Sequence, residues 1–180
     1  MKIQLALKHL HTVGKHRREV RKLCFKCGLY WQGLVHDLSK YSLVEFIPQI
    51  KYWTGKRSPI DEEIDDIGYS SAWLHHKGRN KHHYEYWLDP AHCKEPVEIP
   101  KKYIVEMFCD RVAASKTYRG NDYKQTDPIS YLVLKRRKEQ FLMNAKSYRI
   151  LHILCDCLAL YGEDYVCKRI REWLKGATNF

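Results

Sequence analysis

Glycine and proline residues divide this sequence into segments that carry the start and stop signals of helices. Gly28, Gly78, Gly120 and Gly162 follow stretches with helical spacing of apolar residues, and Pro100 stands where another helix would begin. Gly is common just after a helix C-terminus, and Pro is well tolerated in the first helical turn. The alternating Val, Ile and Thr patterns that are typical of strands are missing. The sequence therefore predicts an all-α fold.

The same signals predict the helix boundaries. Helices are expected over residues 3–27, 42–52, 59 to near 78, 80–88, 100–120, 127 to beyond Phe141, 147–161 and 163–175, with loops at 91–98 and 120–126. Ser42 followed by Glu45 predicts a capping box at the start of one helix. The chain has 180 residues and no internal repeat. We expect one helical domain over residues 1–180.

Composition indicates the kind of partner and the compartment. Lys and Arg number 32 against 21 acidic residues, a net charge of +11. This favours anionic partners such as phosphate esters, nucleotides or nucleic acid. No apolar run reaches the length of a membrane span and the N-terminus does not read as a signal peptide, so no membrane partner is expected. Seven Cys, an odd number on apolar helical positions, indicate reduced thiols and a cytoplasmic location.

The pair His36-Asp37 is the most informative local feature. It follows the apolar residues Leu34 and Val35, which suggests a helix end packed inside the protein. A neutral imidazole and a carboxylate can both bind one divalent cation, which would offset the cost of burying them. The alternative is that Asp37 caps the next turn and His36 is a hydrogen-bonded core histidine.

Helical periodicity identifies further candidate ligands. Counting from His16 along the helix reaches Val20, Leu23, Cys24 and Cys27, so His16 belongs to the inward-facing stripe. The same count from His11 reaches a charged face, and His11 is the second choice.

Asp110 lies in the middle of the expected helix 100–120, on the face that also carries Met107 and Ala114. A carboxylate there is costly unless it is paired or metal-bound. An intrahelical pair with Lys102 or Arg111 is the alternative, but neither has the favoured acid-then-base spacing of four.

Residues 73–84 contain two His pairs, 75–76 and 82–83, together with Arg79 and Asn80. The alternative to a functional segment is a basic loop that binds metal adventitiously. Arg79 and Asn80 are suited to donate hydrogen bonds to a phosphate. Lys40, three residues after Asp37, would reach Asp37 or a bound phosphate, unless it is an ordinary exposed lysine. The aromatic residues at 73, 84, 86 and 87 would stack a base or pack the core.

The stretch His36-Asp37-Leu38-Ser39-Lys40 resembles the motif of the HD-domain superfamily, which are helical metal-dependent phosphohydrolases. The resemblance extends over roughly residues 9–118 as an early His, the His-Asp pair, a His-rich segment with Arg-Asn, and a late Asp. The family's spacing fits His11 better than His16, whereas burial favours His16. The resemblance implies that one His of each later pair binds a second metal or contacts the substrate. We assign His76 and His83 to metal, and His75 and His82 to substrate.

The resulting hypothesis is a metal-dependent phosphohydrolase that acts on a phosphate ester, possibly a nucleotide. One or two divalent transition metal ions (Mn, Fe, Co or Zn) would be held by His16, His36, Asp37, His76, His83 and Asp110. Asp37 is the candidate general base, and Lys40, Arg79 and Asn80 would bind the phosphate. One alternative is an HD-fold di-iron oxygenase, and another is a non-enzymatic basic module that binds nucleic acid. The basic run 135–138 is interpreted as a solvated helix face.

Overall fold

A computed structural model describes residues 2–55, 57–138 and 142–178, and every regular element in these ranges is a helix. In chain order they are α1 (Lys2–Lys26), α2 (Tyr30–Val35), η1 (Leu38–Tyr41), α3 (Leu43–Lys51), α4 (Pro59–Ile67), α5 (Ser71–Arg79), η2 (Tyr84–Trp87), α6 (Lys101–Arg119), η3 (Gly120–Asp122), α7 (Asp127–Lys138), α8 (Ala145–Tyr161) and α9 (Glu163–Leu174), where η denotes a 3₁₀ helix. The all-α prediction is confirmed. None of the helices in the described ranges is both long and apolar enough to cross a membrane.

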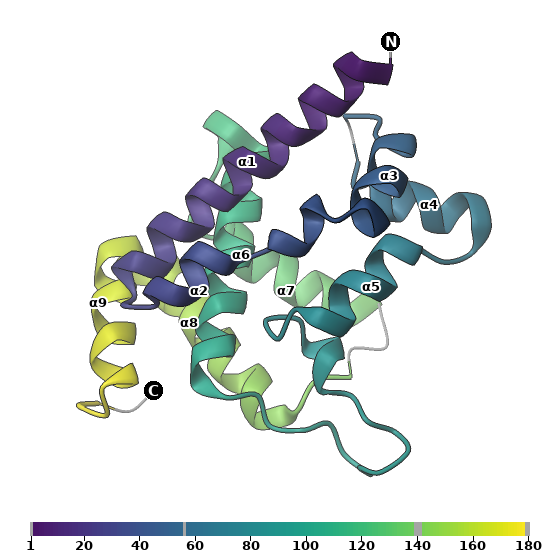
Figure 1. Cartoon of the computed structure of the whole chain (residues 1–180). Helices are drawn as coiled ribbons and strands as arrows, with labels where there is room; N and C mark the ends of the chain where they lie inside the picture. The colour runs from purple at the N-terminus through teal and green to yellow at the C-terminus, as the bar shows by residue number, and fades with distance from the viewer. Residues whose placement is uncertain (1, 56, 139–141, 179–180) are drawn as a thin grey trace.

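Helix α6 forms the centre of the bundle. It contacts α1, α7, α8 and α9, and Figure 1 shows it between α9 on one side of the molecule and α3 and α4 on the other. Side chains from Ile104 to Cys109 are buried without interruption. A helix that is buried around most of its circumference must be covered on several sides, as α6 is.

The hydrophobic core fills the space between α6 and its neighbours as one continuous cluster. Helices α1, α8 and α9 each contribute a stripe of residues three or four positions apart, as the sequence pattern indicated. The fully buried members of these stripes are Val20 and Cys24 on α1, Leu151, Leu154, Cys155 and Leu158 on α8, and Val166 and Ile170 on α9. The cysteines of the described residues are free thiols in this structure.

The expected continuous helix over residues 59–78 is wrong, because it is split into α4 and α5. Gly68 has φ 83 and ends α4 in the left-handed conformation that glycine adopts readily. Ser70 then caps α5, since its side chain accepts a hydrogen bond from the backbone N–H of Trp73 at 3.0 Å. Glu63 stabilises the turn by accepting hydrogen bonds from the hydroxyls of Ser70 and Ser71.

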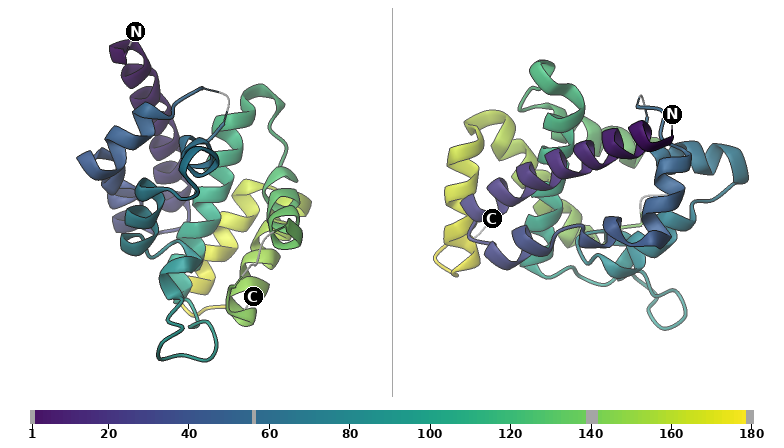
Figure 2. Two further views of the ribbon diagram at one scale, coloured as in Figure 1. Left: turned by 90° about the vertical axis from the view of Figure 1, so that its right-hand side faces the viewer. Right: turned by 45° about the horizontal axis from the view of Figure 1, so that its top comes forward.

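Other local expectations are also corrected. Residues 80–88 contain only the short 3₁₀ helix η2 instead of an α-helix. The capping box of α3 is not formed, because Ser42 makes no side-chain cap and the Glu45 carboxylate is directed elsewhere. Phe141 lies outside the described residues, and α7 ends at Lys138 as described. Figure 2 shows the loop after η2 protruding from the bundle.

Glu163, the first residue of α9, links three helices by ion pairs. Its carboxylate lies 2.7 Å from the Lys26 ammonium at the end of α1 and also contacts Lys116 of α6. Burial alone would raise the pKa of Glu163, but the two ammonium groups lower it below 4.5. The carboxylate also occupies the first helical turn, where the helix dipole favours negative charge.

We predict that Glu163→Gln lowers the free energy of unfolding at pH 7 by about 1 kcal/mol, because two lysines lose their shared anion. Since the folded-state pKa of Glu163 is lowered, its contribution is present above the ordinary value of 4.5 and is lost as pH falls through the folded-state pKa. Urea unfolding at pH 7 and at the lowest pH that preserves the fold measures this. Asp164→Asn, which removes a carboxylate that is 92% exposed, is the control and should have a smaller effect. An equal difference at both pH values would contradict the prediction.

Candidate metal centre

The turn that carries His36 and Asp37 joins α2 to η1 and has an unusual backbone. Asp37 has φ 53° and ψ 27°. Every other described residue with a positive φ is a glycine. This conformation costs an L-residue about 1–2 kcal/mol, and Asp tolerates it better than most. Arg17 of α1 fixes the preceding turn, because its guanidinium donates to the carbonyl oxygens of His36 (2.8 Å) and Leu34 (3.1 Å). Leu34, expected inside, is half exposed, whereas His36 and Asp37 are each 1% exposed.

The first candidate metal group consists of His16, His36, Asp37 and Asp110, which come from α1, the α2–η1 turn and α6. His16 Nε2 lies 2.9 Å from Asp110 Oδ1 and 3.9 Å from Asp37 Oδ2. His36 Nε2 lies 3.4 Å from Asp37 Oδ2 and 3.6 Å from Asp110 Oδ1. All four positions were predicted from the sequence as metal ligands. His11 is exposed, so of the two early candidates the structure brings His16 to the group.

The second candidate group consists of Asp37, His76, His82 and His83. His76 Nε2 lies 3.2 Å and His82 Nε2 lies 3.4 Å from Asp37 Oδ1. Asp37 therefore directs one carboxylate oxygen to each group. His82, assigned from the sequence to the substrate, belongs to this group together with the predicted His76 and His83.

These distances suit metal binding. Ligands about 2.1 Å from one ion are separated by roughly 3 to 4 Å, and the ligand atoms within each group all lie within 4.8 Å of one another. His36 Nε2, Asp37 Oδ1 and His82 Nε2 are also buried without a hydrogen bond in the described part of the chain. Buried polar atoms are rarely left in this state, and a cation would satisfy them.

Glu106 of α6 lies outside these two groups but forms a third candidate group with His36 and His82. His36 Nδ1 lies 3.0 Å and His82 Nδ1 lies 3.2 Å from Glu106 Oε1. A carboxylate that accepts the Nδ1–H of a histidine leaves Nε2 with its lone pair directed at the metal position. Glu106 was not predicted from the sequence. Its spacing of four residues before Asp110 places it on the same helix face and was an available signal.

Glu45 of α3 has the same relation to the first His pair. Its carboxylate oxygens lie 2.7 Å from His75 Nδ1 and 2.8 Å from His76 Nδ1. The side chain is fully buried. Glu45 was interpreted from the sequence as a helix cap, so its contacts with histidines 30 and 31 residues away were missed.

Lys40 contacts the shared carboxylate, with Nζ 2.6 Å from Asp37 Oδ2 and a side chain that is 21% exposed. Burial would lower the pKa of Lys40, but Asp37 and Asp110 raise it. For Asp37 the directions are reversed. Burial would raise the pKa of this carboxyl, but His36, Lys40 and His76 hold it well below its ordinary value. The predicted approach of Lys40 to Asp37 is thus present.

Arg79 and Asn80, expected to bind phosphate, do not line the cleft that opens beside the two groups. The exposed Arg79 donates from Nε to His75 Nε2 at 2.8 Å. Asn80 donates from Nδ2 to the carbonyl oxygen of His76 at 2.8 Å and to Ser39 Oγ at 2.9 Å. These residues support the His-rich segment, and His75 belongs to none of the candidate metal groups found in the described part of the chain.

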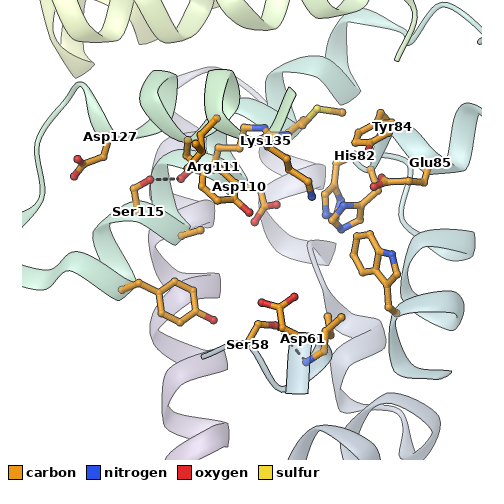
Figure 3. A pocket seen from close by; sticks show the side chains of 18 of the residues that line it. Ser58, Asp61, His82, Tyr84, Glu85, Asp110, Arg111, Ser115, Asp127 and Lys135 are labelled. Carbon is orange, nitrogen blue, oxygen red and sulfur yellow. Dashed lines mark hydrogen bonds between the residues drawn. The ribbon is translucent and has the colours of Figure 1, made fainter. Parts of the chain in front are cut away.

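The cleft has a volume of about 830 Å³ and is lined by residues of α4, α5, η2, α6 and α7. His82, His83 and Asp110 form part of its wall, so it gives access to both groups (Figure 3). Its cationic lining residues are Arg111, Arg119 and Lys135. Lys135 belongs to the basic run 135–138, which was expected to be a solvated helix face, yet it is half-buried and lines the cleft. The four aromatic residues that would either stack a base or pack the core divide between the two roles. Trp73 and Tyr84 line the cleft, while Tyr84 also belongs to the core cluster and Trp87 packs against it.

Comparison with known proteins defines the family. The model of a family described as "Family of unknown function (DUF5662)" matches residues 5–168. The chain belongs to this family. The matched range includes every residue of both candidate groups in this DUF5662 protein. No curated protein and no solved structure matches the chain.

We predict that Glu106→Gln weakens binding of a divalent transition metal by about 10- to 100-fold, the effect typical of losing a carboxylate behind a ligating histidine. Titration calorimetry with Mn²⁺ or Zn²⁺ measures the affinity. The control is Glu98→Gln. Glu98 lies in the loop before α6, and its half-exposed carboxylate contacts Lys146 of α8. Equal affinities for the two variants would show that Glu106 does not orient ligands.

The choice between the early histidines gives a second test. We predict that His16→Ala abolishes retention of one metal ion, because Nε2 lies within the first group, whereas His11→Ala retains the metal content of the wild type. Elemental analysis after gel filtration provides the measurement. Loss of metal from the His11 variant alone would mean that spacing, and not burial, identifies the ligand.

Proposed function

We propose that this protein is a metal-dependent phosphohydrolase of the HD type that acts on a small phosphate ester. The observation that carries the proposal is the buried Asp37 carboxylate shared between two groups of histidine and aspartate ligands. The order of the ligands along the chain also agrees with the HD pattern. The early His, the His-Asp pair, the His-rich segment and the late Asp all meet in space.

The side chains present fit divalent transition metals. Imidazole nitrogen and carboxylate oxygen together suit Mn, Fe, Co and Zn, and no thiolate belongs to the candidate groups found among the described residues. His16, His36, Asp37 and Asp110 would hold one ion. Asp37, His76, His82 and His83 would hold the second. Ions bound there would polarise a phosphoryl oxygen and supply a nucleophilic hydroxide near neutral pH.

The chain's own residues would divide the remaining work. Because each carboxylate oxygen of Asp37 faces one candidate group and Lys40 contacts Oδ2, we assign this carboxylate to metal binding instead of general base catalysis. Lys40 neutralises the Asp37 oxygen that faces the first group. Glu45 and Glu106 keep the imidazole rings in place. The net charge of +11 favours an anionic substrate. The cleft offers it Arg111 and Lys135, although Asp61, Glu85, Asp110 and Asp127 also line the cleft.

We predict that Asp37→Asn removes bound metal and strongly reduces phosphate release. The reduction should exceed the roughly 10- to 100-fold loss that is typical when a residue hydrogen-bonded to a metal ligand is replaced. Asn is the most informative replacement, because it also tolerates positive φ and therefore preserves the turn while removing the charge. Metal content is measured by elemental analysis. Phosphate release is measured with a panel of phosphomonoesters, nucleotides and cyclic dinucleotides and with Mn, Co, Zn and Fe. Asp164→Asn on the exposed start of α9 is the matched control.

The panel also separates this proposal from its alternatives. No phosphate release from any compound at full metal occupancy would reject the phosphohydrolase and favour oxidation chemistry at two irons, since the same ligands suit iron. A visible absorption spectrum of protein purified without oxygen tests that alternative. Salt-dependent binding to RNA or DNA that survives Asp37→Asn would instead favour a nucleic-acid-binding module.

A further inference from the structure

Helix α7 supplies one wall of the cleft, although no local pattern in its residues connects it with the candidate metal groups. Lys135 of α7 is half-buried and lines the cleft. Figure 3 shows its side chain extending into the cleft toward Asp110 and His82. An ammonium group in this position faces any ligand that contacts either metal group.

Arg111 lies beside Lys135 on the adjacent wall, contributed by α6 (Figure 3). Its guanidinium carbon lies 5.9 Å from the centre of the Tyr131 ring, and its Nε is buried without a hydrogen bond in the described part of the chain. A buried guanidinium donor of this kind requires an acceptor, and phosphate oxygens suit the planar donors of arginine. The third cation, Arg119, has an exposed side chain that contacts the Asp127 carboxylate at 3.4 Å.

The opposite wall of the cleft has a different character. Ser58 and Asp61 of the α4 end lie across the cleft from Arg111 and Lys135 (Figure 3), and Ile60 and Ile64 of α4 also line it. A polyanion would meet the Asp61 carboxylate, so the charges favour a ligand with a single phosphate at one end.

Aromatic and apolar side chains complete the cleft. Tyr118 and Tyr131 line it with 64% and 55% of their surface exposed, and Leu134 is 48% exposed. Trp73 lies deeper, with its ring centre 4.8 Å from that of His83. Exposed aromatic side chains around a concave site are typical of surfaces that bind a ligand with a flat apolar part.

We propose that Lys135 and Arg111 bind the phosphate group of the substrate, and that the cleft selects phosphate monoesters whose organic part carries a flat ring. This inference rests on the proposed function, because only that function makes the bound ligand a substrate. The binding itself does not require turnover. The phosphate would lie between Lys135, Arg111 and the metal groups, and the ring would contact the exposed tyrosines.

Two non-hydrolysable probes test the two halves of the proposal. Methylphosphonate presents the anionic group alone, and phenylphosphonate adds a flat ring to it. Calorimetric dissociation constants at constant physiological salt and constant metal content are compared for the wild type and its variants. We expect the wild type to bind phenylphosphonate about 2- to 10-fold more tightly than methylphosphonate, as expected for one aromatic contact.

Substitutions then assign the contacts. Lys135→Met should weaken the binding of both probes by about 10- to 100-fold, the effect of losing a hydrogen bond to a charged group. Arg137→Met removes the same charge from an exposed position two residues along α7 and should change binding less than about 2-fold. Lys135→Arg should recover most of the affinity. Tyr118→Leu should weaken only phenylphosphonate binding, and Tyr165→Leu, an exposed tyrosine on α9, is its control.

Each outcome decides the proposal separately from the proposed function. Unchanged binding by folded Lys135→Met, or an equal loss in Arg137→Met, would overturn the phosphate-binding role. Equal affinities of the wild type for the two probes would overturn the selection of a flat ring. If the probes bind as expected while no phosphomonoester is hydrolysed, the binding site stands and the hydrolase function fails. Circular dichroism and the melting temperature establish that each variant is folded.

Discussion

Burial of the Asp37 carboxylate is the constraint on which the arrangement of this protein depends. An isolated carboxylate would be unstable in the interior, so opposite charges and hydrogen-bond donors must surround it. The sequence supplies them from separate helices: His16 from α1, His76 from α5 and Lys40 from η1. The left-handed backbone at Asp37 turns the side chain into this environment. Its local cost of about 1–2 kcal/mol is small compared with the interactions that the turn makes possible.

Helix α6 connects this polar centre with the hydrophobic core. One face carries Phe108 and Val112 into the apolar cluster, and another carries Glu106 and Asp110 toward the histidines. The acidic residues are four positions apart and therefore lie one helical turn from each other. A single rigid element thus places one candidate ligand and the carboxylate that orients two others. Core packing of α6 consequently sets the geometry of the candidate site.

The sequence indicated the helices and most candidate ligands because their signals are local. Gly and Pro mark helix ends, and periodicity places His16 and Asp110 on inward faces. The break at Gly68 was missed although Gly68 and Ser70 carried an adequate signal. The roles of Glu45 and Lys135 had no adequate local signal, since their partners come from distant segments. A capping residue and a solvated lysine are the ordinary interpretations of such positions, and only the tertiary arrangement distinguishes them.

The neighbouring residues His16 and Arg17 give α1 two attachments that cannot be adjusted independently. His16 lies in the first group, and Arg17 holds the carbonyl oxygens of the α2 end. Translation of α1 by a single residue would rotate it by about 100° and move both side chains away from their partners together. A shift in the register of α1 would therefore break both attachments at once. A partner that pulled on α1 would act on the ligand and on the turn that carries Asp37 in the same movement.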